Sequence, residues 1–197
     1  MQPNVLTIPA ALSERVVRGR VALNVLLILG ASALIALAAQ IAIPVPFSPV
    51  PLTMQPLAVL LVGVVLGSWR GAAAAILYLL EGASGLPVFS QGHAGAIWLA
   101  APTGGYLMSY PFAAFLAGWL SERGWGSNVR RAVMAMLAAL VVIYAGGWAW
   151  LATLTDARSA FAMGVAPFVV ADIVKVAFGA ALLPWAQKIV TMSFRAP

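Results

Sequence analysis

The chain contains no cysteine and a single histidine, and only 8% of its 197 residues are charged. The absence of cysteine excludes disulfides, thiol catalysis and thiolate metal sites. A lone imidazole does not make a metal site, so we expect no bound metal and place His93 in a surface loop. The sequence also lacks paired carboxylates and the HExxH, GxSxG and GxxxxGK(S/T) motifs. No catalytic residues are therefore predicted, and we do not expect an enzyme.

Apolar residues dominate instead: 63% of the chain is hydrophobic, with a mean hydropathy of +1.00. Soluble domains carry about 25% charged and 45–50% apolar residues. The composition therefore predicts an integral membrane protein, embedded in the lipid bilayer. A net charge of +6 would favour nucleic acid as a partner of a soluble protein. Here the basic residues flank apolar segments, so no nucleic-acid partner is expected.

Proline, glycine and basic residues separate six apolar segments, which predicts an all-α protein with six transmembrane helices. The predicted spans are residues 21–43, 57–68, 72–83, 104–120, 133–154 and 163–190. The second and third are short for a hydrocarbon core about 30 Å thick, so we expect them to be tilted or shielded by neighbours. Residues 1–20 are predicted to be a cytoplasmic basic tail, 21–190 the transmembrane domain, and 191–197 a second cytoplasmic tail.

The basic residues also predict the orientation, because cytoplasmic loops carry an excess of Lys and Arg. With both termini cytoplasmic, nine of the eleven basic residues lie on the inner side: Arg15, Arg18, Arg20, Arg70, Arg123, Arg130, Arg131, Lys188 and Arg195. The two loops rich in proline or glycine, residues 44–55 and 85–103, then face outward.

Two charged residues, Asp172 and Lys175, interrupt the apolar run from Val165 to Ala186. At about 1.5 Å per residue this run is long enough to cross a membrane, and a charge placed there costs about 2.5–3.5 kcal/mol on insertion scales. A spacing of three brings both side chains to one face of a helix. Such a pair either neutralises itself and tethers helices, or binds a polar group of a ligand. We favour ligand binding.

Small residues recur at intervals of four in the first predicted span, in the pairs Ser32/Ala36 and Ala38/Ala42. Such pairs allow helices to approach closely in lipid. They serve either ordinary packing inside the protein or docking of a partner helix.

Four segments together resemble the signature segments of the BioY family, the biotin-specific S components of energy-coupling factor (ECF) transporters. The resemblance covers residues from about 30 to 188. The segments are Pro44-Val45-Pro46-Phe47 with Pro51-Leu52-Thr53-Met54-Gln55, Gly85-Leu86-Pro87-Val88-Phe89, Pro102-Thr103-Gly104-Gly105-Tyr106, and Asp172-Ile173-Val174-Lys175.

The resemblance implies a six-helix S-component bundle that captures biotin, the transported ligand, from the external side for ATP-driven uptake. It also implies a transmembrane coupling subunit and two ATPase subunits as partners, with no cofactor. Asp172 and Lys175 would belong to the biotin site, residues 44–55 would form a lid, and Ser32 and Ala36 would meet the coupling subunit. The remaining substrate-binding candidates are Phe47, Gln55, Phe89, Gln91, Trp98 and Tyr106.

The chemistry of biotin leaves two arrangements open at the charged pair. Asp172 could accept a ureido N–H while Lys175 donates to the ureido carbonyl, or Lys175 could face the carboxylate tail. An alternative function is a stand-alone secondary carrier or channel for a small organic solute, with both charges on an ion path. Such carriers often contain inverted repeats, and none is evident in this sequence.

Overall fold

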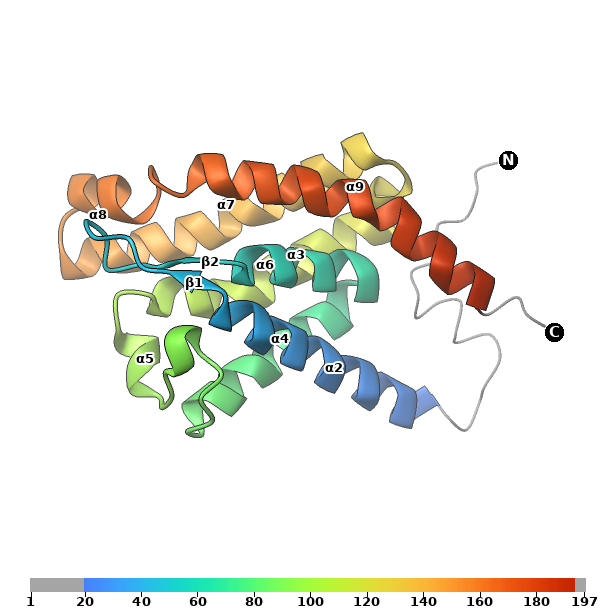
Figure 1. The fold of residues 1–197 in the computed structure, drawn as a ribbon, viewed down its shortest axis with the longest axis horizontal. Helices are drawn as coiled ribbons and strands as arrows, with labels where there is room; N and C mark the ends of the chain where they lie inside the picture. Colours follow the sequence, from blue (N-terminus) through green and yellow to red (C-terminus); the bar gives the residue numbers. More distant parts are fainter. Residues whose placement is uncertain (1–19, 194–197) are drawn as a thin grey trace.

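The computed structural model describes residues 20–193, and this part of the chain is mostly helical (Figure 1). The elements are α2 (Arg20–Gln40), β1 (Ala42–Ile43), β2 (Leu52–Thr53), α3 (Gln55–Leu66), α4 (Ser68–Ala83), η1 (Ser90–Gly92), α5 (Ile97–Ala100), α6 (Gly104–Glu122), η2 (Trp125–Ser127), α7 (Val129–Leu154), α8 (Ala157–Gly164) and α9 (Val169–Ser193). Most of the two predicted tails, residues 1–19 and 194–197, lies outside the described residues.

The long helices coincide with the predicted spans, with shifted ends. Helices α2 and α7 are each long and apolar enough to cross a membrane, and the bent pair α8–α9 makes a third candidate if it forms one span. Helix α7 begins four residues before the predicted start because the Asn128 side chain caps it, accepting a hydrogen bond from the backbone N–H of Arg131 at 2.9 Å. Six crossings remain a prediction.

The predicted last span, residues 163–190, is not one helix. Helices α8 and α9 meet at an angle of 47°, with a turn at residues 165–168 between them. Pro167 lies in that turn, and proline removes a backbone donor and interrupts helices. Asp172 consequently lies in the first turn of α9 rather than two turns inside a longer helix.

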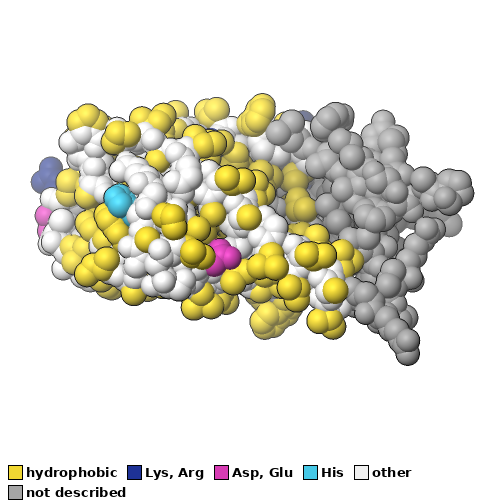
Figure 2. Space-filling model, turned by 60° about the horizontal axis from the view of Figure 1, so that its bottom comes forward, with side chains coloured by type: hydrophobic (Ala, Val, Ile, Leu, Met, Phe, Trp, Pro, Cys, Tyr) yellow, Lys and Arg dark blue, Asp and Glu magenta, His cyan; other side chains and the backbone are white. Residues whose placement is uncertain are grey.

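Helix α6 runs through the middle of the bundle and packs against α3, α4 and α7. Small residues allow these close contacts: a Cβ atom on Gly63 would collide with the backbone oxygen of Ala114, and one on Gly118 with the backbone at Gly67. The outside is apolar as well, and Figure 2 shows hydrophobic side chains spread over one face with few charges. An apolar core inside an apolar exterior is typical of a membrane protein.

The proline-rich segment after α2 forms a narrow antiparallel hairpin in which Ala42 pairs with Thr53 and Ile43 with Leu52. In Figure 1 the hairpin runs along the bundle from α2 toward α8. The Ser48 hydroxyl, near its tip, donates to the backbone oxygen of Met163 in α8 at 2.7 Å. The extended loop expected from the prolines is therefore ordered and tied to the far side of the bundle.

The glycine-rich segment from Gly85 to Thr103 is ordered by the short helices η1 and α5. The backbone N–H of Gly95 donates to Gly82 O at 2.7 Å, which ties the segment to α4. In Figure 1 this segment, the hairpin tip and α8 lie toward one end of the bundle, whereas α2 begins and α9 ends toward the other. Both loops are thus gathered at the same end.

Candidate functional site

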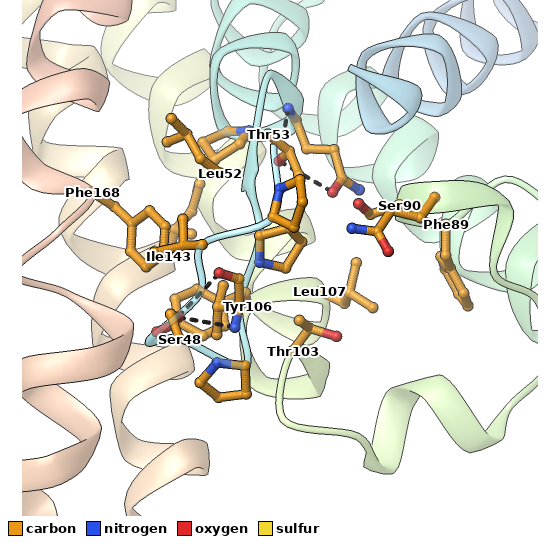
Figure 3. A pocket seen from close by; sticks show the side chains of 18 of the residues that line it. Ser48, Leu52, Thr53, Phe89, Ser90, Thr103, Tyr106, Leu107, Ile143 and Phe168 are labelled. Atoms are coloured by element: carbon orange, nitrogen blue, oxygen red, sulfur yellow. Dashed lines mark hydrogen bonds between the residues drawn. The ribbon is translucent and has the colours of Figure 1, made fainter. Parts of the chain in front are cut away.

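A cavity of about 280 Å³ lies beneath the two loops (Figure 3). The hairpin covers it, the segment after α4 closes one side, and α6, α7 and α9 form the rest of the wall. Its lining is mainly apolar and aromatic, with a few polar groups, which is the usual character of a small-molecule site. The polar and aromatic residues of the lining include Ser90, Gln91, His93, Trp98, Tyr144 and Asp172.

Asp172 is the charged centre of this wall and is only 4% exposed. Its Oδ1 accepts a hydrogen bond from Lys175 Nζ at 2.7 Å, and its Oδ2 accepts one from the Tyr144 hydroxyl at 2.7 Å. The predicted shared face of Asp172 and Lys175 is thus confirmed, and the two form an ion pair, as expected for the alternative of a pair that neutralises itself. Because each carboxylate oxygen has two acceptor positions, Asp172 can still accept hydrogen bonds from a ligand.

Lys175 does not line the cavity. Its ammonium group donates both to Asp172 and to the backbone oxygen of Thr53, at 2.8 Å, in the second strand of the hairpin. Lys175 therefore neutralises the carboxylate and ties the hairpin to α9. Of the two charges, Asp172 is the one presented to the cavity, and it presents an acceptor.

Six of the eight substrate-binding residues predicted from the sequence line the cavity: Gln55, Phe89, Gln91, Trp98, Tyr106 and Asp172. Phe47, like Lys175, does not; its side chain is 66% exposed. The turn at the hairpin tip, closed by a hydrogen bond from Ser48 N to Val45 O at 3.0 Å, directs it outward. Phe47 therefore does not contribute to the wall of the cavity.

Gln55 borders the cavity, but its amide belongs to a buried network. Its Nε2 donates to the Tyr78 hydroxyl at 2.6 Å, and that hydroxyl donates to Val88 O at 3.2 Å. Phe89 packs edge-on against Tyr78, with ring centroids 5.6 Å apart. This network joins α3 and α4 to the loop above them and holds Phe89 in the wall.

The two residues predicted to dock a partner differ in burial. Ser32 is fully buried and its hydroxyl donates to a carboxylate oxygen of Glu81 on α4, so it serves internal packing and presents no surface to a partner. Ala36 is partly buried. The exposed face of α2 instead carries Leu26, Ala33 and Leu37.

Several lining residues have no signal in the sequence. Tyr144 lies in an apolar stretch of α7 and reaches Asp172 only through the packing of α7 against α9. The hydroxyl oxygen of Ser90 is buried without a hydrogen-bond partner. His93, expected in a surface loop, does lie in a loop, but it borders the cavity and stacks on Trp98 with ring centroids 3.6 Å apart.

The described helices have the arrangement of a known membrane transport subunit. Over 88% of this chain and 95% of the other, they superpose with a TM-score of 0.78 and 23% sequence identity on a crystal structure of the S-component for biotin from an ECF-type ABC transporter. At that identity, the likeness establishes the S-component fold.

Sequence comparison identifies the family within that fold. The model of the BioY family matches residues 11–192, and this chain belongs to that family. It is 43% identical to a probable biotin transporter BioY of Pyrococcus horikoshii, over 74% of this chain and 84% of the relative. It is 40% identical to the biotin transporter BioY of Rhizobium etli, over 80% of this chain and 89% of the relative.

Proposed function

We propose that this chain is the biotin-binding subunit of an ECF transporter, which captures biotin from the external side for ATP-driven uptake. The observation that carries the proposal is a buried carboxylate, Asp172, presented as an acceptor in an apolar cavity under two ordered loops. Relatives at 40% identity or more are named as biotin transporters. A stand-alone carrier or channel has no comparable support, because Lys175 is held by Asp172 and Thr53 and does not face the cavity.

The orientation of the ligand follows from the hydrogen-bonding groups. Biotin carries two ureido N–H donors at one end and a carboxylate at the other, with an apolar sulfur ring between them. Asp172 can accept from a ureido N–H, and the Tyr144 oxygen beside it has a free acceptor position. A carboxylate would be repelled there. The ureido ring therefore lies against Asp172 and Tyr144, and Lys175 acts on the ligand through Asp172.

Six membrane crossings with both termini cytoplasmic are part of the proposal. The distribution of basic residues supports them, as does the position of the α6–α7 connection, which lies away from the cavity (yellow in Figure 1). Arg123 lies in this connection, and Arg130 and Arg131 lie in the first turn of α7 directly after it. Residues 21–190 would form one domain in the cell (inner) membrane. The cavity would then open outward.

The test of this function is equilibrium binding of biotin to the purified chain in nanodiscs, without partner subunits. We expect saturable binding of one biotin per chain, and no binding of a molecule that keeps the tail but lacks the ureido ring, such as pentanoate. Absence of biotin binding by folded protein would overturn the proposal. Uptake driven by a proton gradient, with the chain alone in vesicles, would favour the carrier.

We further propose that α2 docks on the transmembrane coupling subunit, which carries the two ATPase subunits. Helix α2 is less covered by the rest of the protein than α7, the other long candidate span. In the most apolar 18-residue stretch of each helix, 22% of α2 is buried, compared with 39% of α7. Gly30 and Ala33 lie on this exposed face, and a Cβ placed on Gly30 would meet nothing within 4 Å. The small side chains leave a shallow depression in the middle of the face. A partner helix can approach closely at such small residues.

Ala33→Trp is therefore expected to reduce co-purification with the coupling subunit at least tenfold, because an indole would hold the two helices apart. Its affinity for biotin should equal that of the wild type. Val141→Trp, at a 64% exposed position of α7, is the matched control and should leave assembly intact. Equal assembly of both variants would exclude this face of α2 as the interface.

A further inference from the structure

One face of α6 carries a column of large side chains that the rest of the protein leaves open. Phe112, Phe115, Trp119 and Arg123 follow one another at spacings of three and four residues, so they share a helical face. Phe112 and Trp119 are exposed, and Phe115 is partly buried. Trp69 of α4, which is 79% exposed, stands beside the column and meets Phe115 edge-on, with ring centroids 5.6 Å apart. The two helices thus present an aromatic surface to the outside of the bundle.

The column ends at the guanidinium group of Arg123. Its Cζ atom lies 3.3 Å from the centroid of the Trp119 ring. So short a distance requires the flat face of the guanidinium to lie against the indole, because its N–H edge would otherwise meet the ring first. The N–H donors then point outward along that edge. Within the described part of the chain this side chain forms no hydrogen bond and no ion pair, so its donors are available to an anion.

The neighbouring carboxylate does not neutralise Arg123. Glu122 Oε1 accepts a hydrogen bond from the backbone N–H of Ser68 at 2.8 Å, and its Oε2 accepts one from the Ser68 hydroxyl at 3.0 Å. Glu122 therefore compensates the positive N-terminal end of α4. Arg130 and Arg131 are exposed in the first turn of α7, directly after the connection from α6. This end of the bundle thus keeps an excess of positive charge.

The length of the column indicates what kind of anion fits. From Phe112 to Arg123 the column rises about 16 Å, at about 1.5 Å per residue. One leaflet contributes about 15 Å of the hydrocarbon core of a bilayer, which is about 30 Å thick. A phospholipid has the same layout, with an acyl chain of this length and a phosphate at one end. Inorganic phosphate would use Arg123 alone and leave the aromatic rings uncovered.

We propose that this surface binds an anionic phospholipid, with the phosphate at Arg123 and one acyl chain along Trp119, Phe115 and Phe112. A guanidinium group binds phosphate through two parallel hydrogen bonds, and Trp69 borders the acyl chain on the side of α4. The net charge of a lipid such as phosphatidylglycerol complements the positive charge at this end. The site is separate from the cavity, which lies at the opposite end of α6.

The experiment places the purified chain in nanodiscs that contain equal amounts of phosphatidylglycerol and phosphatidylcholine. The protein is then extracted into a mild detergent, and the lipids it retains are counted by native mass spectrometry. For the wild type, we expect about fivefold more phosphatidylglycerol than phosphatidylcholine, corresponding to about 1 kcal/mol for one arginine at an anionic lipid. Arg123→Gln should retain the two lipids equally. Arg131→Gln removes the same charge nearby and is the matched control, which should keep the preference.

Two variants of the indole test the stacked geometry. Trp119→Leu should lose most of the preference because no ring lies beneath the guanidinium, whereas Trp119→Phe should keep it. In nanodiscs of phosphatidylcholine alone, the Arg123 and Arg131 variants should unfold at the thermal midpoint of the wild type, which separates lipid binding from misfolding.

Three results would overturn the inference: equal retention of both lipids by the wild type, a preference that persists in Arg123→Gln, or an equal loss in Arg123→Gln and Arg131→Gln. A dimer of the purified chain that dissociates in Arg123→Gln would assign the surface to a second copy and would overturn it as well. Biotin takes no part in these measurements, so a failure of the proposed function would leave this inference unaffected.

Discussion

Asp172→Asn is expected to weaken biotin binding at least tenfold, equivalent to about 1.4 kcal/mol. Asparagine has nearly the same volume, but it replaces one acceptor oxygen with a donor NH₂ group. That group would face either the Tyr144 hydroxyl or a ureido N–H, both of which are donors in the proposed complex. Hydrogen bonds to a charged acceptor are also about twice as strong as those to a neutral one. Equilibrium binding of biotin to the purified variant is the measurement.

Two further variants separate this effect from misfolding. Tyr144→Phe keeps the carboxylate and removes one donor to it, so we expect a smaller loss of affinity, about two- to tenfold. Asp156→Asn changes an exposed carboxylate that caps α8, and asparagine caps helices equally well, so biotin affinity should not change. Wild-type affinity of Asp172→Asn, measured on protein with the wild-type thermal midpoint, would remove Asp172 from the site.

Short-range patterns in the sequence were sufficient to predict the helices and to place Asp172 and Lys175 on one helical face. Apolar composition predicted the membrane bundle, and a spacing of three predicted the pair, because both depend on residues close together in the chain. The break before α9 was also readable from Pro167, yet the apolar run across it suggested one continuous span. Apolar character alone does not distinguish a bent pair of helices from a straight one.

The direction of each side chain at the site depended on distant parts of the chain. Lys175 turns from the cavity because the hairpin places Thr53 O beside it, a contact between residues 122 positions apart. Tyr144 meets Asp172 only because α7 packs against α9. Neither contact has a periodic pattern in the sequence, so the shared face of the pair could be predicted but not which of its members borders the cavity.

Lys175→Met is expected to produce the largest loss of stability, because it leaves Asp172 as a buried charge without its partner. Removing one member of a buried ion pair costs about 3–5 kcal/mol, and Tyr144 remains as the one side-chain donor to that carboxylate among the described residues. The bond from Lys175 to Thr53 O is lost as well, so we expect the hairpin to loosen at its second strand. Thermal unfolding in detergent and the dissociation rate of biotin measure the two consequences.

The double variant Asp172→Asn/Lys175→Met determines whether the uncompensated charge is the cause. With both charges removed, the thermal midpoint should recover toward that of the wild type, whereas biotin affinity should stay as low as in Asp172→Asn. Such non-additivity is expected for residues in direct contact. A double variant as unstable as the sum of the two single variants would show that the ion pair is not what stabilises this end of α9. Recovery of stability without recovery of binding would separate the role of Lys175 in balancing charge from that of Asp172 in recognising the ligand.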